Sequence, residues 1–232
     1  SLSFDIGFGR PDPGSMPVEP SRIVRDGRMV GESAGPKYGP NTAKARELSI
    51  QMDPPSPSNE GRGLDLLILT SGGVSEIHGL LLDYPDVNRV HVFDAGVSMP
   101  ALAELRAYDC TIVMNDTPFA DTDALGDLLA EHAETGGAVV TAVASFGGEP
   151  WNLGGRWMAE GFEPLTANSA GPVLESVALG AFDPDHPIMA GVSSAFDLLQ
   201  SDVSLSPGAE WVAEWEDGNP LVATRFGNIA SI

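Results

Sequence analysis

Between residues 64 and 146, short apolar runs alternate with segments in which apolar positions recur at helical spacing. The stretch LDLLILT at 64–70 is almost continuously apolar, which is typical of a strand buried on both faces of a sheet. Three further strands are expected at 89–95, 110–116 and 138–146, with helices between them at 74–85, 98–109 and 121–137. This βαβαβαβ order predicts an α/β domain with an open parallel sheet and helices on both faces.

The pattern becomes less regular after Phe146. Residues 147–165 are rich in glycine and aromatic residues and are expected to form a long ordered loop, with a further strand at 172–179. The last segment, 209–232, predicts two or three antiparallel strands joined at the hairpin sequence EDGNP.

Residues 1–63 have a different composition, because proline recurs through most of the segment and excludes regular helices there. The apolar pieces at 1–8 and 41–52 favour a strand or, in the second case, one or two helical turns. We therefore expect an extended N-terminal arm that lies on the main domain or on a neighbouring copy and ends in a linker at about 53–63. A disordered segment is the alternative. The domain boundaries that follow are 1–63 for the arm and 64–232 for the α/β domain.

The net charge of the chain excludes some classes of binding partner. The chain has 33 acidic and 12 basic residues, a formal net charge of −21, so nucleic acid and anionic membranes are not expected as partners. Such a surface suits an extracellular or cell-surface setting, where salt screens dense like charge. No EF-hand loop and no zinc-type histidine spacing is present, so no metal and no cofactor is expected, although calcium binding stays open. The chain begins at Ser1, with no visible signal peptide and no apolar run of membrane-spanning length, so no membrane insertion is expected.

Polar residues at the ends of the expected strands are the candidate ligand-binding residues. Ser71-Gly72-Gly73 follows the first strand and opens a helix, where free N–H groups favour an anion. Asn115-Asp116 ends the third strand at the edge where open α/β sheets bind ligands, and Asp116 suits a sugar hydroxyl. Trp151 is placed to stack on a carbohydrate. Each site also has a structural alternative. Residues 71–73 can form a plain tight turn, Asp116 can cap the following loop, and Trp151 can cover the edge of the sheet.

Several stretches resemble the class I glutamine amidotransferase-like superfamily, and within it the trehalose-utilisation-protein-like branch. These stretches are ILTSGG, LRAYDCTIVMND, LLAEHAETGGAVV, DPDHPIMAGV and EWEDGNPLVATRFG, spread over residues 64–232. The resemblance implies a flavodoxin-like sheet with a functional cleft at the carboxyl ends of its strands. Similar modules also occur in large secreted or surface bacterial proteins, where they need not be enzymes.

The chain departs from the superfamily at its catalytic motifs. The cysteine of the Gly-x-Cys-x-Gly elbow is replaced by Ser145, the first glycine by Val143, and the glutamate after His186-Pro187 by Ile188. Serine elbows occur in the superfamily's peptidases, with a histidine base that a third group orients. An alternative catalytic set is therefore Ser145, His186 and Asp183, although no catalytic residue is favoured.

Two functions from different classes follow. The first is a non-catalytic structural or interaction module of a larger extracellular or surface assembly, which binds protein partners or copies of itself through the N-terminal arm. The second is a serine-dependent hydrolase or carbohydrate-processing enzyme that uses Ser145 and His186.

Overall fold

The computed structural model describes residues 2–6, 22–25, 28–32, 46–52, 63–72, 75–173, 176–197 and 200–232. Their backbone contacts divide the chain into two compact units. The first contains Ser1–Ser56, Val173–Gln200 and Glu214–Gly218, and the second contains Pro57–Pro172, Ser201–Ala213 and Asn219–Ile232.

The second unit is built on a parallel sheet. Its parallel strands are β5 (Leu64–Ser71), β6 (Val87–Asp94), β7 (Cys110–Asn115), β8 (Ala138–Thr141) and β15 (Ile229–Ser231). Their order in space is β6-β5-β7-β8-β15, which numbered along the chain is 2-1-3-4-5, the order of flavodoxin-like folds. The apolar run LDLLILT forms β5, which has a strand on either side, and every residue of β5 but the first is buried.

The fifth parallel strand corrects the prediction that the C-terminal strands are only antiparallel. β13 (Glu210–Trp215) and β14 (Pro220–Arg225) flank the predicted hairpin sequence and are neighbours. β15 is antiparallel to β14, but on its other side it runs parallel to β8, with Ile229 opposite Val139. Because a strand has two edges, one short C-terminal segment completes the parallel sheet and continues the antiparallel one.

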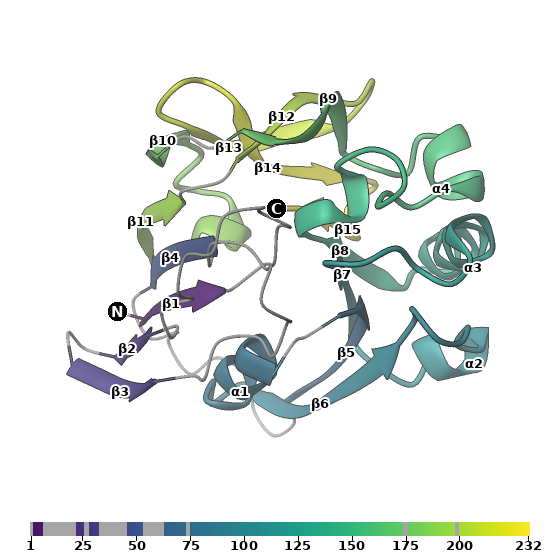
Figure 1. Ribbon diagram of the computed structural model, residues 1–232, viewed down its shortest axis with the longest axis horizontal. Coiled ribbons are helices and arrows are strands. Elements are labelled where there is room, and N and C mark those ends of the chain that lie inside the picture. Colours follow the sequence, from purple (N-terminus) through teal and green to yellow (C-terminus); the bar gives the residue numbers. More distant parts are fainter. Residues whose placement is uncertain are drawn as a thin grey trace, which may run out of the picture. The chain divides into compact units, whose positions relative to one another are not determined.

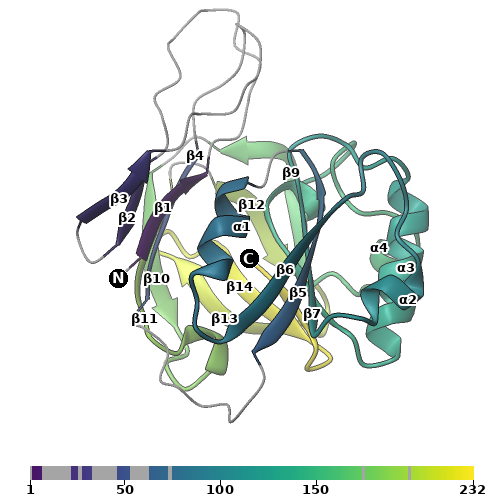
Figure 2. The same cartoon turned by 90° about the horizontal axis from the view of Figure 1, so that it is seen from below.

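Helices cover both faces of this sheet (Figures 1 and 2). The helix α1 (Ser75–Leu82) lies on one face, and α2 (Leu102–Leu105), α3 (Thr122–Glu134) and α4 (Gly155–Ala159) lie on the other. The predicted α/β class, with a mostly parallel sheet and helices, is therefore confirmed. The larger apolar core lies under α2 to α4 and contains Leu67, Leu69, Ala95, Leu105, Val113, Phe119, Leu125, Leu129, Ala130, Ala133, Val139, Leu153, Trp157, Phe162 and Ile229.

Two of the predicted elements are shorter in the structure than the sequence pattern indicates. The helix expected at 98–109 is only α2, because it begins after Pro100, and its first residue is preceded by Ala101, which offers no side-chain cap. The strand expected at 138–146 ends at Thr141 and is followed by the 3₁₀ turn η1 (Val143–Phe146). The helix expected at 121–137 is confirmed as α3, with Asp121 Oδ1 accepting a hydrogen bond of 2.9 Å from Ala124 N.

After α4 the second unit contains a separate two-stranded sheet formed by β9 (Leu165–Val173) and β12 (Gln200–Leu205). The long loop before it, predicted to be ordered, contains α4. Because Trp157 on α4 is fully buried, the loop and helix are fixed against the core rather than left on the surface.

The first unit is an antiparallel arrangement of strands. Its members are β1 (Leu2–Ile6), β2 (Arg22–Arg25), β3 (Arg28–Glu32), β4 (Arg46–Met52), β10 (Val177–Phe182) and β11 (Val192–Asp197), with the turn η2 (Pro187–Met189) before β11. Their order is β3-β2-β1-β4-β11-β10, and β4 pairs with β11 so that Ile50 lies opposite Ala195. The strand alternative for residues 41–52 is thus the one observed. The segments of the predicted arm between these strands, and the predicted linker at 53–62, lie outside the described residues.

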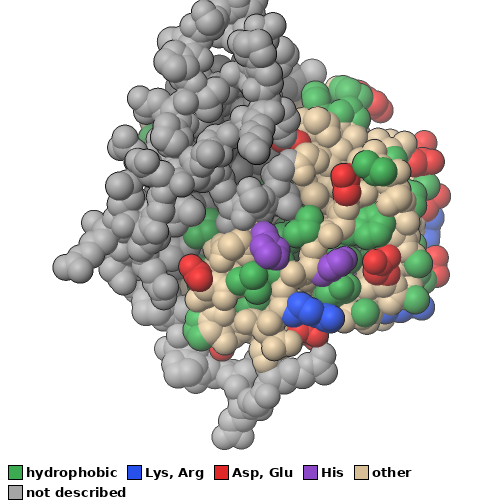
Figure 3. Space-filling model, turned by 60° about the horizontal axis from the view of Figure 1, so that its bottom comes forward, with side chains coloured by type: hydrophobic (Ala, Val, Ile, Leu, Met, Phe, Trp, Pro, Cys, Tyr) green, Lys and Arg blue, Asp and Glu red, His purple; other side chains and the backbone are tan. Residues whose placement is uncertain are grey.

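Acidic side chains are scattered over the described surface, with basic ones in only a few places on the face that Figure 3 shows. Among the described residues, no helix is long and apolar enough to cross a membrane.

Candidate functional site

The carboxyl ends of β5 and β7 meet at the centre of the parallel sheet. From β5 the chain turns to one side to form β6, whereas β7 and the later strands lie on the other side. This makes the ends of β5 and β7 the topological switch point, where open α/β sheets hold their ligands. The last residues of the two strands, Ser71 and Asn115, are direct neighbours in the register.

Ser71 fastens the end of β5 to the loop after β7. Its side chain is buried, and its Oγ donates to Pro118 O at 2.9 Å. Because Ser71 Oγ has only one proton, the 2.7 Å contact with Thr117 Oγ1 is then donated by Thr117. The carbonyl of Ser71 accepts from Asp116 N at 3.0 Å. Ser71 therefore fixes the loop, and its single hydroxyl proton is already used in the hydrogen bond to Pro118 O.

Gly72 and Asp116 lie in close contact. Gly72 has a φ of 125°, and a Cβ added to it would lie only 1.3 Å from Asp116 Oδ1. The carboxylate of Asp116 therefore packs against the bare Cα of Gly72, in space that any other residue would fill with its side chain. The turn that the sequence predicted as a place for an external anion already has an anionic side chain of the protein beside it. Gly73 lies outside the described residues.

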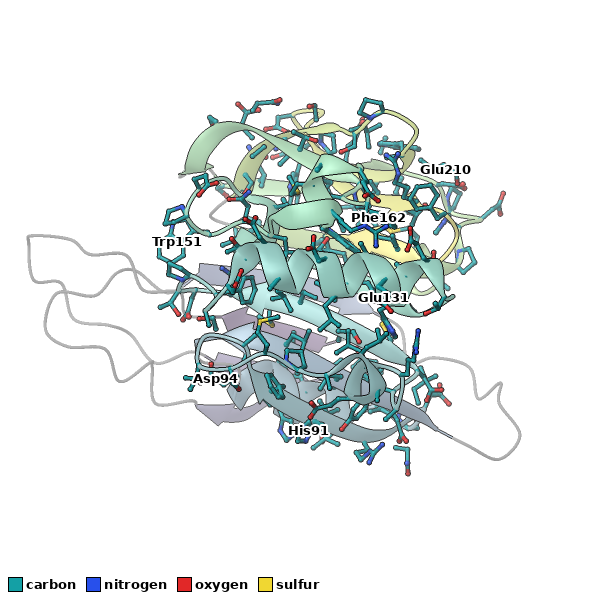
Figure 4. The ribbon with its side chains drawn as sticks, turned by 90° about the vertical axis from the view of Figure 1, so that its right-hand side faces the viewer. His91, Asp94, Glu131, Trp151, Phe162 and Glu210 are labelled. Carbon is teal, nitrogen blue, oxygen red and sulfur yellow. The ribbon has the colours of Figure 1, made fainter. Side chains whose placement is uncertain are left out.

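Asn115 connects β7 to the loop that contains Trp151. Its Nδ2 donates to Thr117 O at 3.1 Å and to Trp151 O at 2.8 Å, so two carbonyl acceptors fix the orientation of the amide. Its Oδ1 is buried and has no hydrogen-bond partner, although the residue is only 1% exposed. Trp151 itself is half-buried, and Figure 4 shows it at the same end of the layered domain as Asp94, the last residue of β6.

The structure thus brings together the predicted ligand-binding residues that it describes: Ser71, Gly72, Asn115, Asp116 and Trp151. We call these five residues the switch-point cluster. Carboxylate and amide oxygens are its dominant groups, and its chemistry is that of a hydrogen-bond acceptor.

The predicted elbow has a different character. Ser145 is fully buried in η1, its Oγ donates to Ala142 O at 2.9 Å, and it does not have the positive φ that a strained nucleophile turn imposes. The side chain of Phe146 is also buried. These are the contacts of a serine that closes a helical turn.

His186 and Asp183 belong to the first unit, where both side chains support a local turn. His186 Nδ1 accepts from Ile188 N at 3.3 Å and caps η2, and Asp183 Oδ1 accepts from Asp185 N at 3.0 Å. The backbone N–H of His186 donates to Asp183 O at 3.2 Å. Each of these two side chains thus accepts a hydrogen bond from a backbone N–H of its own turn.

A second polar cluster, which the sequence analysis missed, lies at the ends of β8 and β15. Glu163 is almost fully buried there, and its Oε1 accepts from Thr141 Oγ1 at 3.0 Å and from Ser231 Oγ, while its Oε2 accepts from Trp157 Nε1 at 2.8 Å. We call these four residues the Glu163 cluster. Burial raises the pKa of the Glu163 carboxyl, against the opposing effect of the hydrogen bonds that it accepts. The only signal in the sequence was an acidic residue between apolar neighbours in GFEPL.

The remaining reactive side chains show no sign of activation. Burial, assisted by the nearby Asp109, raises the pKa of the Cys110 thiol to about 11, which keeps it protonated. Burial and, secondarily, Arg106 lower the pKa of His132. Arg156 pairs with Glu134 and Glu160, and within the described part of the chain no group of three or more His, Cys, Asp or Glu side chains is arranged to hold a metal ion.

Comparisons with known proteins find solved structures that have a similar fold. No family model and no curated protein sequence matches the chain. Among solved structures, a ThuA-like protein from Bacteroides uniformis is 16% identical, covers 77% of this chain and 85% of its own, and has a TM-score of 0.55. A cytoplasmic protein from Salmonella typhimurium is 14% identical, covers 73% of this chain and 87% of its own, and has a TM-score of 0.56. At these identities the likeness shows a shared fold, that of ThuA-like structures, which fits the resemblance to the trehalose-utilisation-like branch.

Proposed function

We propose that this chain is a non-catalytic interaction module that binds a small polar ligand at the switch-point cluster. The observation that carries the proposal is the convergence of Ser71, Asn115 and Asp116 at the edge where such sheets bind ligands. Since the residues come from two strands and from the loops after them, a ligand there would contact several elements at once.

The contacts of Ser145 support a non-catalytic role. A serine nucleophile needs an exposed Oγ whose proton a base can remove, whereas this proton is donated to Ala142 O beneath a closed surface. The candidate base, His186, already accepts a backbone N–H through one ring nitrogen. Activity through these residues would need both turns to rearrange.

The ligand class that we propose is a carbohydrate or a comparable polyol. Half-buried Trp151 offers an aromatic surface, and Asn115 and Asp116 offer acceptors for hydroxyl groups.

The larger setting that we propose is an extracellular or cell-surface assembly, in which protein partners or further copies of the chain bind the N-terminal arm. The net charge of −21 supports this setting, because salt outside the cell screens such repulsion. Light scattering on size-separated protein at low and high salt tests self-association. A monomer under both conditions would leave only other proteins as partners for the arm.

Two experiments test the site. Labelling with a fluorophosphonate probe, read by intact mass, is expected to give no adduct on the folded protein or on Ser145→Ala. Stoichiometric labelling that Ser145→Ala abolishes would replace this proposal with the hydrolase that uses Ser145, His186 and Asp183. In parallel, titration with a panel of neutral sugars is expected to shift the backbone amide resonances of Gly72 and Asp116, and a panel that shifts neither would refute the ligand site.

A further inference from the structure

The turn between β14 and β15 has an unusual backbone. It consists of Phe226, Gly227 and Asn228, because Arg225 and Ile229 on its two sides are paired in the register. Phe226 has a φ of 56°, and it is the only residue other than glycine with a positive φ in the part of the chain that the structure describes. Such a backbone favours Gly, Asn or Asp, so a phenylalanine there is strained.

The turn keeps this conformation because Asn228 fixes it to the neighbouring loop. Asn228 Nδ2 donates to Ala133 O at 2.9 Å and to Gly137 O at 2.8 Å. The Phe226 side chain is left 64% exposed, although its ring meets that of the core residue Phe162 edge-on, with 5.7 Å between the centroids. A strained backbone that presents a large apolar side chain to solvent is not explained by stability alone.

Arg225, the residue before this turn, stacks on the exposed ring. Its Cζ lies 4.8 Å from the centroid of the Phe226 ring, and its Nη1 donates to Pro207 O at 2.6 Å. Its Nε is buried without a hydrogen-bond partner, and its Nη2 donates to no acceptor among the described residues. Because a guanidinium has five N–H groups, most of the donor capacity of Arg225 is not used within the protein.

A second arginine in the same unit shows what this pair lacks. Arg89 Cζ lies 4.9 Å from the centroid of the Tyr108 ring, and Arg89 Nη2 forms an ion pair with Asp65 Oδ2 at 3.0 Å. In the described part of the chain no carboxylate forms an ion pair with Arg225, although the protein has 33 acidic and 12 basic residues. Arg225 therefore has the aromatic neighbour but not the acid.

Two glycines leave the edge of the guanidinium open. A Cβ added to Gly161 would lie 3.6 Å from Arg225 Nη2, and one added to Gly208 would lie 3.8 Å from it. Both glycines have a positive φ, of 70° and 84°, so side chains are disfavoured at these two positions. The N–H groups at this edge are of the kind that pairs with a carboxylate.

We propose that Arg225 and Phe226 form a docking site for an acidic segment of a partner protein. A carboxylate of the segment pairs with the Arg225 guanidinium, and a neighbouring apolar side chain packs on the Phe226 ring. Arginine and exposed aromatic residues are the side chains that protein interfaces favour. Because the turn precedes β15, which runs parallel to β8, the site lies at the amino edge of the sheet, opposite the switch-point cluster. It is independent of the ligand proposed for that cluster and uses no residue of the N-terminal arm.

The test uses three capped tetrapeptides: acetyl-Gly-Phe-Asp-Gly amide, the same peptide with Asn in place of Asp, and the same peptide with Ala in place of Phe. Each is titrated into the full chain, and the backbone amide resonances of Phe226 and Gly227 and the Nε–H resonance of Arg225 are followed. The first peptide is expected to bind about fivefold more tightly than either of the others, since each of those lacks one of the two contacts. Raising the salt concentration is expected to narrow only the difference between the Asp and Asn peptides.

Two substitutions separate the roles of the two side chains. Arg225→Gln is expected to remove the preference for the Asp peptide over the Asn peptide. Phe226→Asn, whose side chain suits a positive φ, is expected to weaken the first peptide to the level of the Ala peptide without lowering the midpoint of thermal unfolding. The control is Arg89→Gln, which makes the same charge change at an arginine that already has its acid, and it is expected to keep the full preference.

Each contrary outcome removes a stated part of the proposal. An Asn peptide that binds as tightly as the Asp peptide, or a preference that Arg225→Gln leaves unchanged, overturns the carboxylate contact. An equal loss in Arg89→Gln shows that net charge acts instead of Arg225, with the same consequence. A Phe226→Asn variant that binds as before but unfolds at a lower temperature assigns the phenylalanine to the fold and refutes the docking site.

Two further observations complete the test. If Arg225→Gln does not fold, Arg225→Lys replaces it, because lysine keeps the charge but lacks the planar fork, and it is expected to bind the Asp peptide more weakly than wild type does. Shifts of the Phe226 and Gly227 resonances with protein concentration alone would assign the site to a second copy of this chain and overturn a separate partner. If none of the peptides shifts these resonances, the docking site is refuted while the ligand site at the switch-point cluster stands.

Discussion

The carboxyl edge of one sheet carries two polar clusters that have opposite properties. In the Glu163 cluster, the two carboxylate oxygens accept from Thr141, Ser231 and Trp157, and all four side chains are buried. In the switch-point cluster, Asn115 Oδ1 has no donor, and Asp116 and Trp151 are only half-buried. A polar group whose partners all come from the protein stabilises the fold, whereas a buried polar group that lacks a partner calls for another explanation. Polarity alone therefore does not mark a functional site.

The largest expected effect is the loss of the Glu163 carboxylate. Glu163→Ala leaves the Trp157 N–H without its acceptor and opens a cavity, so the free energy of unfolding is expected to fall by about 3 kcal/mol. Glu163→Gln keeps the shape and one acceptor, and its loss is expected to be about 1 kcal/mol. Urea unfolding of the three proteins measures both values. Equal losses would mean that the stability depends on the carboxylate, which both variants lack, and that the side-chain volume kept by Gln contributes nothing.

The next largest loss of stability is expected when the contact between Gly72 and Asp116 is disturbed. Gly72→Ala places a Cβ against the Asp116 carboxylate in a backbone conformation that favours glycine, and a loss of about 2 kcal/mol is expected. Gly136→Ala is the matched control, because Gly136 has a φ of 91° and nothing within 4 Å of an added Cβ. Only the backbone cost of about 1 kcal/mol is expected for the control. If the free energy of unfolding falls by the same amount in both variants, the close packing of Asp116 against Gly72 does not contribute to stability.

Glu163 also gives the protein a pH dependence. Its pKa in the folded state is raised by burial, so the folded state holds the proton more tightly than the unfolded state does. Stability from this group is complete below the unfolded pKa of about 4.3 and is lost as the pH rises through the folded pKa. The difference in unfolding free energy between wild type and Glu163→Gln is therefore expected to shift against the wild type on going from pH 4 to higher pH. A difference that stays constant across this range would contradict a raised pKa.

The smallest effect is expected at Ser145. Removing its hydroxyl in Ser145→Ala deletes the bond to Ala142 O, so a loss of about 1 kcal/mol in thermal unfolding is expected. Sugar titrations of this variant are expected to match those of the wild type, because Ser145 does not belong to the switch-point cluster. Weaker binding by Ser145→Ala would extend the ligand site toward β8.

Much of the architecture could be read from local patterns. The continuous apolar run of β5 and the capped, periodic α3 are determined by burial and by helix geometry within a few residues, so both were predicted. That the residues at the strand ends lie close together was also predictable, because the carboxyl ends of parallel strands meet at one edge of the sheet. The helix predicted at 98–109 was too long: α2 spans only Leu102–Leu105, because the helix begins after Ala101, which provides no side-chain cap.

What the sequence alone determined is therefore the alternation of strands and helices, the acidic surface and the residues that stand at the strand ends. Only the tertiary structure decided which of those residues keep an unused hydrogen-bonding atom. The parallel course of β15 beside β8, and the burial of Glu163 among donors from residues 141, 157 and 231, depend on partners far apart in the chain. Hydrogen-bond satisfaction is a property of a pair of groups in space, so a sequence shows which atoms can bond but not which of them remain unpaired.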